Sequence, residues 1–329
     1  MSIKPKFIDL FAGIGGFRLG MTAAGFKGVF GADHNKHAAL MYKENFGEEI
    51  LRDITAIEAK TIPDFDVMCA GFPCQPFSLA GGQLGFLDKT RGTLFFDLCR
   101  IIQEKQPNVV FLENVKNLAT HDKGNTLKVI IESLEKLGYT ATYKVLNARD
   151  FGVPQSRERI IIVANRKGIK FDFDKVKQVK PKSMERFLDK DSSSFEILAP
   201  EEYTLLSLPE RKLQKSGLIF AGYRNKEMRG KGVRANSENL SRAHKQPNRI
   251  YSAEGTHPTL SSQETSGRYF ILHNDQVRKL TLNECYKFMG FPKNFKKIGS
   301  KSDLYNRIGN SICVPMVKAV AQQIKEQLF

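Results

Sequence analysis

Short runs of hydrophobic residues alternate, along the first half of the chain, with stretches in which hydrophobic positions recur at helical spacing. Strands are predicted over residues 7–11, 29–32, 66–70, 109–112, 143–146 and 160–164, and helices over residues 16–24, 36–46, 93–104 and 125–137. Several runs end at Gly or Pro, as buried strands commonly do where they open into a loop. This alternation predicts an α/β fold with a doubly wound, mostly parallel, Rossmann-like sheet.

The alternating pattern fades after residue 170. Residues 170–195 are charged and rich in Ser, and the sequence beyond them has no clear helical period but much Gly, Ser, Asn and Arg. We expect a boundary here, followed by a smaller, irregular domain of strands and loops. Helical spacing returns over residues 280–289 and again over 314–329, where it predicts an amphipathic closing helix. The expected division of the chain is 1–180, 181–275 and 276–329.

The chain carries a formal charge of +16, and this charge is unevenly distributed. Residues 205–250 hold eleven Lys or Arg against three Glu, a net +8 and half of the total. Because the basic residues are interleaved with Gly, Asn, Gln and Tyr223, the stretch favours a polyanionic partner, above all a nucleic acid. A membrane surface is the weaker alternative, since the stretch lacks an amphipathic apolar face.

The hydrophobic stretches and the cysteines of the sequence indicate where in the cell the protein is found. No hydrophobic stretch is long enough to cross a bilayer, and the N-terminal residues lead straight into a predicted strand, so we expect a soluble, cytoplasmic protein without a signal peptide. The five cysteines are an odd number and include no C-x-x-C pair. This predicts free thiols, and neither disulfides nor a zinc site.

Two strand ends present chemically useful groups. Cys74 directly follows the strand predicted over residues 66–70, and Glu113 follows the strand over 109–112. Ligands bind outside the carboxyl ends of strands in open α/β sheets, so a thiol and a carboxylate are presented together. Each alone has a plainer interpretation, since a single Cys is most often a small buried hydrophobe and a strand-terminal Glu often caps a helix. The pair favours a nucleophile with an acid–base partner.

A glycine-rich turn, Phe11-Ala12-Gly13-Ile14-Gly15-Gly16, follows the first strand. Glycine lets the backbone approach a ligand closely, but the third glycine of a dinucleotide fingerprint is replaced by Arg18, which disfavours NAD. Asp33 ends the second strand, where an acid can bind ribose hydroxyls, and Asp53 can accept a hydrogen bond from an adenine amino group. Each acid alone is more simply a turn residue. Together they indicate a ligand that contains a nucleoside.

Five sequence blocks resemble those of the DNA (cytosine-5) methyltransferases of bacterial restriction-modification systems. They are Phe11-Ala12-Gly13-Ile14-Gly15-Gly16, Gly71-Phe72-Pro73-Cys74-Gln75-Pro76-Phe77-Ser78, Glu113-Asn114-Val115, Gln155-Ser156-Arg157-Glu158-Arg159 and Gly309-Asn310-Ser311. The blocks occur in the family's order and cover the chain from the first strand to the last helix, so the resemblance is specific.

The resemblance implies a catalytic domain over residues 1–180 that binds S-adenosylmethionine as methyl donor. The implied donor contacts are Phe11, Gly13, Ile14, Gly16, Asp33, His34, Asp53, Ile54, Pro73, Leu94, Asn310 and Ser311. His34 is a departure, because many relatives carry an aromatic residue there that packs on the adenine, although an imidazole can still stack. For Asn310 to reach the donor, residues 276–329 must return to the catalytic domain.

The resemblance also implies a mechanism. Cys74 is the nucleophile that attacks carbon 6 of cytosine, and Glu113 gives a proton or hydrogen bond to ring nitrogen 3, which makes carbon 5 electron-rich. Arg159 is expected to reach the cytosine O2 and to help hold the thiolate. Arg157 is expected beside it, since alternate residues of an extended segment point the same way. No metal is required.

The target base must leave the duplex for this chemistry, as it does for methyltransferases in general. Gln246 is expected to fill the vacated space and Arg249 to read guanine bidentately, although either side chain could instead bind phosphate. Ser78 and Thr259 are the other expected DNA contacts. Residues 181–275 would then form the target recognition domain that family members carry in this region.

The favoured function is methyl transfer from S-adenosylmethionine to carbon 5 of a flipped cytosine, in a specific duplex DNA sequence, through a covalent Cys74 adduct. Two alternatives stay open: a tRNA cytosine-5 methyltransferase of the same fold, and a non-catalytic DNA-binding protein, which would have no need of both Cys74 and Glu113. Expected partners are duplex DNA and a cognate restriction endonuclease acting on the same site. The protein is expected to be a monomer in the bacterial cytoplasm.

Overall fold

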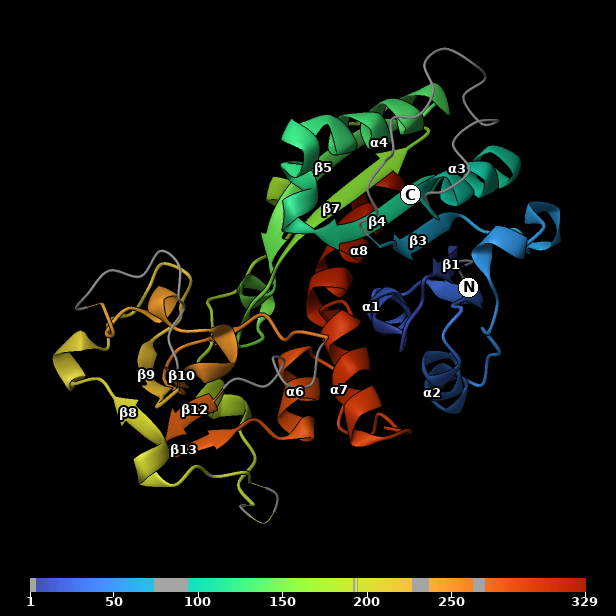
Figure 1. Cartoon of the computed structure of the whole chain (residues 1–329). Helices are drawn as coiled ribbons and strands as arrows, with labels where there is room; N and C mark the ends of the chain where they lie inside the picture. Colours follow the sequence, from blue (N-terminus) through green and yellow to red (C-terminus); the bar gives the residue numbers. More distant parts are fainter. Residues whose placement is uncertain (1–3, 74–93, 192, 194, 227–236, 263–269) are drawn as a thin grey trace. The chain divides into compact units, whose positions relative to one another are not determined.

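A computed structural model describes residues 4–73, 94–191, 193, 195–226, 237–262 and 270–329. The chain folds into two compact units (Figure 1). The first contains Met1–Leu146, Glu158–Lys177 and Ile312–Phe329, and the second contains Asn147–Arg157 and Gln178–Ser311. The segment after residue 275 is therefore divided, because only the part from Ile312 onward belongs to the first unit.

The first unit is built on a six-stranded sheet of order β2-β1-β3-β4-β7-β5. β1 pairs in parallel with both β2 and β3, β3 pairs in parallel with β4, and β7 is antiparallel to β4. The predicted α/β fold with a mostly parallel sheet is thus confirmed. The strands are β1 (Lys6–Leu10), β2 (Lys27–Ala32), β3 (Val67–Gly71), β4 (Val109–Val115), β5 (Thr140–Asn147) and β7 (Glu158–Asn165).

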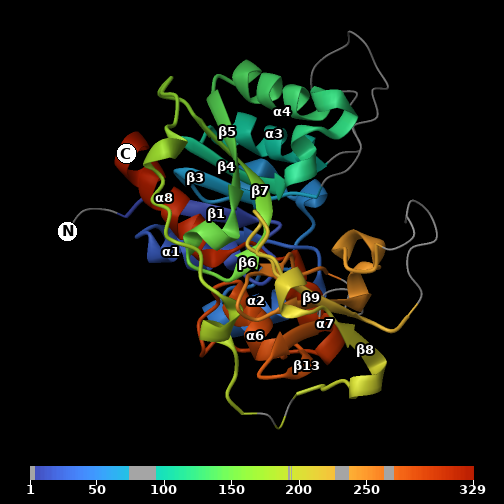
Figure 2. The same ribbon diagram turned by 90° about the vertical axis from the view of Figure 1, so that its left-hand side faces the viewer.

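Helices cover both faces of this sheet (Figures 1 and 2). Because strand side chains alternate between faces, Ile8 and Leu10 of β1 join one apolar core with α3 and α4. On the other face, Phe111 of β4 meets Phe17 of α1 edge-on, with 5.0 Å between ring centroids. The helices are α1 (Gly16–Ala23), α2 (Lys36–Phe46), α3 (Leu94–Lys105), α4 (Asn125–Lys136) and α8 (Val314–Leu328).

The second unit contains a separate five-stranded sheet of order β13-β12-β10-β9-β8 and a two-stranded pair of β6 and β11. This agrees with the smaller domain of strands and loops expected from the sequence. Its elements are β6 (Gln155–Ser156), β8 (Tyr203–Leu205), β9 (Phe220–Arg224), β10 (Arg249–Ser252), β11 (His257–Pro258), β12 (Phe270–His273), β13 (Gln276–Lys279), α6 (Leu282–Phe288) and α7 (Lys301–Asn310).

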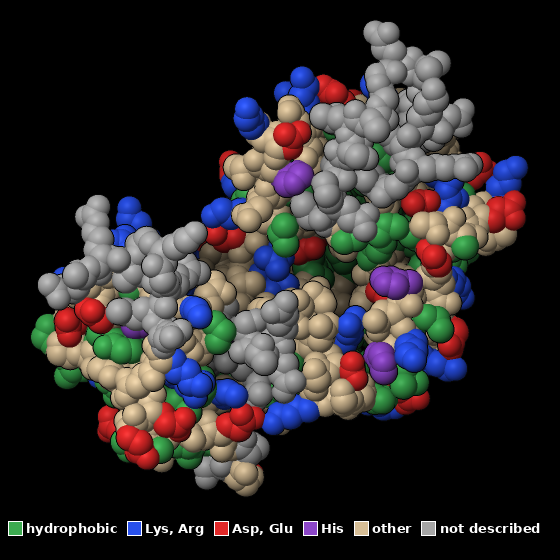
Figure 3. Space-filling model, in the orientation of Figure 1, with side chains coloured by type: hydrophobic (Ala, Val, Ile, Leu, Met, Phe, Trp, Pro, Cys, Tyr) green, Lys and Arg blue, Asp and Glu red, His purple; other side chains and the backbone are tan. Residues whose placement is uncertain are grey.

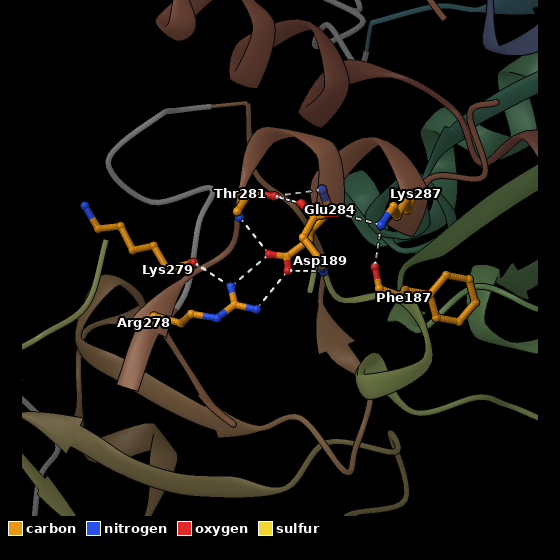
Figure 4. Close-up of polar contacts among 7 residues, drawn as sticks. All are labelled: Phe187, Asp189, Arg278, Lys279, Thr281, Glu284 and Lys287. Carbon is orange, nitrogen blue, oxygen red and sulfur yellow. Dashed lines mark hydrogen bonds and ion pairs between the residues drawn. The ribbon is translucent and has the colours of Figure 1, made fainter. Parts of the chain in front are cut away.

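A buried ion pair joins β13 to α6 in this unit (Figure 4). Arg278 donates to both carboxylate oxygens of Glu284 at 2.9 and 2.8 Å, and the backbone N–H of Thr281, the N-cap of α6, donates to the same carboxylate. Asp189 accepts hydrogen bonds from Thr281 and Lys287. Breaking such a pair by removing one partner costs about 3–5 kcal/mol, because the other charge stays buried. The network therefore anchors α6 to the sheet.

Over the described part of the chain, none of the helices combines the length and hydrophobicity that a bilayer crossing requires. Within the same residues, no group of three or more His, Cys, Asp or Glu side chains is arranged to hold a metal ion. Cys69, Cys99, Cys285 and Cys313 are buried and are not joined by disulfides.

Candidate active site and cofactor pocket

The carboxyl ends of β3 and β4 lie side by side, with Gly71 opposite Glu113. The chain leaves β3 through Phe72 and Pro73, and the buried Asn114 amide donates to the Phe72 carbonyl oxygen at 2.9 Å. The last described residues before Cys74 are thus tied to the strand that carries Glu113. Cys74 itself and Ser78 lie outside the residues that the structure describes.

Glu113 forms an ion pair with Arg159, whose Nε lies 2.9 Å from Oε1 of Glu113. Arg159 pairs with Val115 across β4 and β7, so it lies diagonally from Glu113 on the same face of the sheet. The side chain of Arg159 is only 12% exposed and that of Glu113 only 13%, which strengthens their attraction relative to a surface pair. Oε2 of Glu113 lies 3.5 Å from the position of a Cβ on Gly71. The structure thus brings two of the predicted catalytic side chains together.

Arg157 does not join this pair as the sequence predicted. Its guanidinium is buried in the second unit and donates to the carbonyl oxygens of Leu260, Gly309 and Ser311 at 3.1, 2.9 and 2.7 Å. The prediction assumed one continuous extended segment. Arg157 instead stands between β6, which pairs with β11, and β7, which pairs with β4, so alternate residues here do not share one face. It anchors backbone segments of the second unit.

A cavity of about 440 Å³ opens at the carboxyl ends of β1 and β2, within the size range of ligand pockets. Seven predicted cofactor residues line it beside Ala32 of β2, which was not predicted, and Arg52 and Thr55 also line it without having been predicted. Both flank residues that the sequence did single out, Asp53 and Ile54, and this adjacency was the available signal. The lining residues are Phe11, Ala32, Asp33, His34, Arg52, Asp53, Ile54, Thr55, Pro73 and Leu94.

The glycine-rich loop beside this cavity has left-handed backbone at Phe11, Gly13 and Gly15, with φ of 54°, 53° and 88°. Asp33 holds the loop, since its Oδ2 accepts the Gly13 N–H at 2.8 Å while its Oδ1 accepts the N–H of Asn35 at 2.8 Å. A Cβ on Gly13 would meet no atom within 4 Å, so there is open space beside the backbone. Left-handed backbone at a non-glycine residue is strained, and such strain clusters at ligand sites.

The groups around the cavity fit a nucleoside. Apolar side chains such as Ile54 and Leu94 suit the faces of a base, and the two aspartates suit hydroxyl or amino donors. Hydrogen bonds from the backbone and side chain of Thr55 lower the pKa of Asp53, so this carboxylate is ionised at neutral pH. Of the other predicted contacts, Ile14 and Gly16 belong to the glycine-rich turn itself and are buried.

Asn310 and Ser311 belong to the second unit, at the end of α7. The Asn310 amide donates to Oδ1 of Asn306 at 3.1 Å, and the Ser311 carbonyl accepts from Arg157. Their contact with a cofactor remains a prediction.

The second unit has a cavity of its own, of about 360 Å³. Gln246, in the short helix before β10, and Arg249, the first residue of β10, line it, and Thr259 donates from Oγ1 to the Ser156 carbonyl at 2.9 Å. Guanidinium, amide and hydroxyl groups are those that read base edges. Of the eight lining residues, three were predicted DNA contacts; the full set is Ser156, Leu218, Gln246, Arg249, Tyr251, Pro258, Thr259 and Ser261.

Comparisons with known proteins agree with this arrangement. The family model described as C-5 cytosine-specific DNA methylase matches residues 5–326. The chain is 39% identical to the type II methyltransferase M.HhaI of Haemophilus parahaemolyticus, over 98% of this chain and 95% of that protein. It is 41% identical to the type II methyltransferase M.HaeII of Haemophilus aegyptius, over 96% of this chain and 91% of that protein.

Solved structures share the fold. The crystal structure of a putative DNA modification methyltransferase encoded within an E. coli prophage matches with a TM-score of 0.68 and 20% identity, over 99% of both chains.

A mostly parallel sheet with a nucleoside-sized pocket at its carboxyl edge and a strand-end carboxylate held by arginine fits an α/β methyltransferase. The chain belongs to the C-5 cytosine-specific DNA methylase family. It is a DNA cytosine-5 methyltransferase, which takes a methyl group from a donor and acts on DNA. The tRNA methyltransferase and the non-catalytic DNA-binding protein are not favoured, because the family and its curated members at about 40% identity are DNA methyltransferases.

Proposed function

We propose that this enzyme transfers a methyl group from S-adenosylmethionine to carbon 5 of a cytosine extruded from a specific duplex sequence, through a covalent adduct with Cys74. The observation that carries the proposal is the Glu113–Arg159 ion pair, which lies at the strand ends next to the chain entering Cys74. A carboxylate and a guanidinium at this point supply two polar contacts for the edge of a pyrimidine.

The first unit would hold the methyl donor. Phe11, His34, Ile54, Pro73 and Leu94 would surround the adenine, while Asp33 and Asp53 would bind hydroxyl and amino groups. Gly13, Ile14 and Gly16 would let the loop backbone approach the rest of the molecule, and Asn310 and Ser311 would complete the site. When bound, S-adenosylmethionine supplies an electrophilic methyl group on a sulfonium centre.

The side chains then divide the chemistry. The Cys74 thiolate adds to carbon 6, and Glu113 gives a proton or hydrogen bond to ring nitrogen 3, so that electron density develops at carbon 5. We assign nitrogen 3 to Oε2 of Glu113, because Oε1 already accepts from Arg159. Arg159 would contact the cytosine O2. After carbon 5 gains the methyl group, a water molecule removes its proton, and departure of the thiol restores the ring.

The second unit would recognise the target. Extruding a base costs roughly a few kcal/mol, and Gln246 would offset this cost by filling the vacated space. Arg249 would read a guanine, and Ser78 and Thr259 would add DNA contacts. Arg157 would act indirectly, by holding the backbone that follows Thr259. We further propose that the enzyme is a monomer of the bacterial cytoplasm whose partner is a restriction endonuclease acting on the same site.

Methyl transfer from labelled donor, compared between duplex DNA and tRNA, tests the substrate. Transfer should occur to duplex DNA, and bisulfite sequencing of host DNA should map it to cytosine in one sequence context. Preferential labelling of tRNA would contradict the proposal.

Cys74→Ser should abolish transfer, whereas Cys99→Ala, which changes a buried thiol of α3, should keep it.

A target duplex with 5-fluorocytosine tests the covalent adduct, since fluorine cannot leave as a proton does. With the donor present, wild-type enzyme should remain attached to this duplex under denaturing conditions, and Cys74→Ser should not.

Glu113→Gln should bind the duplex normally but turn over at least about a hundredfold more slowly, as expected on loss of a positioned acid–base group. Lost binding with intact turnover would refute the role of Glu113.

A further inference from the structure

His244, which is not among the proposed DNA contacts, is hydrogen-bonded to Arg249. His244 follows the short helix Ser241–Ala243, and its side chain is buried, with 1% exposed. Its carbonyl oxygen accepts hydrogen bonds from both Nε and Nη2 of Arg249, at 3.1 and 3.0 Å. The direction of the Arg249 guanidinium is therefore set by the backbone of a neighbouring loop.

The imidazole ring fixes that loop in turn. It stacks on Tyr223 with 4.0 Å between centroids and 15° between planes, and Nε2, as the donor, lies 2.7 Å from the Glu238 carbonyl oxygen. Tyr223 of β9 is also the residue that pairs with Arg249 of β10. The stack thus joins the loop that orients Arg249 to the strand pair that carries it.

This arrangement decides which edge of the guanidinium can read a base. A guanidinium has five N–H donors and two edges that can bind two acceptors at once, Nε with Nη2 and Nη1 with Nη2. The His244 carbonyl occupies the first edge. Arg249 also hydrogen-bonds to the side chain of Tyr251. The edge that remains for the acceptors O6 and N7 of a guanine is that of Nη1 and Nη2.

We propose that His244, held by its stack on Tyr223, is a positioning residue that fixes Arg249 for end-on reading of a guanine in the target sequence. The inference rests on the proposed function, in which Arg249 contacts a base. Its physical advantage is that a long, flexible side chain is oriented before DNA binds, so less conformational entropy is lost on binding.

The test measures kcat/KM on the target duplex, once bisulfite sequencing has defined it, and on duplexes that differ by one base pair. Arg249→Ala should reduce discrimination at one guanine by about tenfold or more. His244→Ala should reduce discrimination at the same guanine by a similar factor. The double variant should be no worse than Arg249→Ala, because residues that act through one contact are not additive.

Tyr223→Leu removes the stack from a half-buried position, so it decides the matter if His244→Ala does not fold. It should lose the same discrimination while keeping the unfolding temperature and the affinity for S-adenosylmethionine. His273→Ala, on β12 of the same sheet, is the matched control and should discriminate like the wild type.

Each outcome has one meaning. Unchanged discrimination in a folded His244→Ala or Tyr223→Leu variant, or a loss that adds to that of Arg249→Ala, overturns the positioning role and leaves Arg249 as a reader. Unchanged discrimination in Arg249→Ala overturns the reading role and the inference with it. No methylation of duplex DNA by the wild type overturns the proposed function itself.

Discussion

His34 presents an imidazole to the cofactor pocket among apolar side chains. The chain contains no tryptophan, so His34→Trp would introduce a single indole at this wall. A wider ring covers more of an adenine face, and aromatic pairs contribute about 0.5–1.5 kcal/mol beyond burial, so S-adenosylmethionine should bind about two- to twelvefold more tightly. Titration of the indole fluorescence with S-adenosylmethionine measures this directly.

Tyr143→Trp is the control for that titration, because Tyr143 is half exposed on the edge strand β5. Its emission should not respond to S-adenosylmethionine. The place of His34 in the cofactor pocket would be contradicted if the indole at position 34 did not respond to S-adenosylmethionine. It would also be contradicted if the variant bound S-adenosylmethionine with the affinity of the wild type.

His257 is a buried base that should make the protein sensitive to acid. Burial lowers the pKa of His257 to about 3, although its Nδ1 lies 2.5 Å from the Pro258 carbonyl oxygen. An unfolded histidine titrates near 6.5, so below that pH the unfolded state binds one more proton than the folded state, down to about pH 3. The free energy of unfolding should therefore decrease as the pH is lowered, by up to about 1.4 kcal/mol per pH unit.

His257→Phe keeps a ring next to Phe288 but removes this proton uptake. Between pH 7 and 5, the free energy of unfolding of the variant relative to the wild type should improve by about 2 kcal/mol. Urea unfolding at several pH values gives the comparison, and the relative change matters because the variant also loses the hydrogen bond to Pro258. A difference that stays constant with pH would show that His257 is not the titrating group.

The positions of single side chains could be predicted from the sequence only in part. Asp33 follows β2 and Glu113 lies near the end of β4, as expected, because the hydrophobic runs define where each strand stops. Asp53 instead follows only an isolated bridge at Leu51 and is the N-cap of the short helix Ile54–Ala56. Arg157 and Arg159 are identical in type and two residues apart, yet they lie in different units. What separates them is the change of strand partner at residue 157, which depends on contacts with residues 257–258 that no local pattern contains.

At the scale of elements, the contact of α1 with α8 depends on one glycine. A Cβ on Gly20 would lie 2.5 Å from both Cβ and Cγ1 of Val317 and 3.0 Å from the Val314 carbonyl oxygen. Gly20→Ala should therefore force the helices apart and lower the free energy of unfolding by about 1–3 kcal/mol, even though Ala favours a helix over Gly.

Thermal unfolding measures this effect, with the exposed Thr22→Ala on the same helix as control. The control should unfold near the wild-type temperature. If Gly20→Ala were equally stable, the close packing of α1 on α8 would be wrong.

Elements with a clear period were predicted well, and their spatial order was not. The helix expected over residues 125–137 is α4 (Asn125–Lys136), and the strand expected over 160–164 lies within β7 (Glu158–Asn165). The sequence did not show that β7 stands between β4 and β5. Short strands such as β8, with three residues, leave too few positions for a period to be visible.

At the scale of the whole molecule, the division of the chain follows from long-range contacts. The first unit is completed by α8, whose Val317 packs on α1 some three hundred residues earlier in the chain. Composition showed where the first pattern faded but could not show that residues 276–311 stay with the second unit, because Leu280 to Met289 look equally suited to either core.

The net charge is a property of the whole molecule and should govern its affinity for DNA. Lys and Arg side chains are spread over both units on the face shown in Figure 3, in addition to the +8 of residues 205–250. Each phosphate contacted by such a group releases condensed counterions, so the logarithm of the association constant should fall linearly with the logarithm of salt concentration. About six phosphate contacts would weaken binding roughly a thousandfold between 50 and 200 mM salt.

Fluorescence anisotropy of a labelled target duplex over this range of salt gives the slope, and the binding of S-adenosylmethionine is the internal control. The cofactor pocket carries Asp33 and Asp53 and meets no polyphosphate, so cofactor affinity should change far less than DNA affinity. Lys212→Gln, in the basic stretch, should reduce the slope by about one if that side chain contacts a phosphate. A slope near zero for duplex DNA would contradict the electrostatic basis of binding, because a charge of +16 would then contribute nothing to the contact.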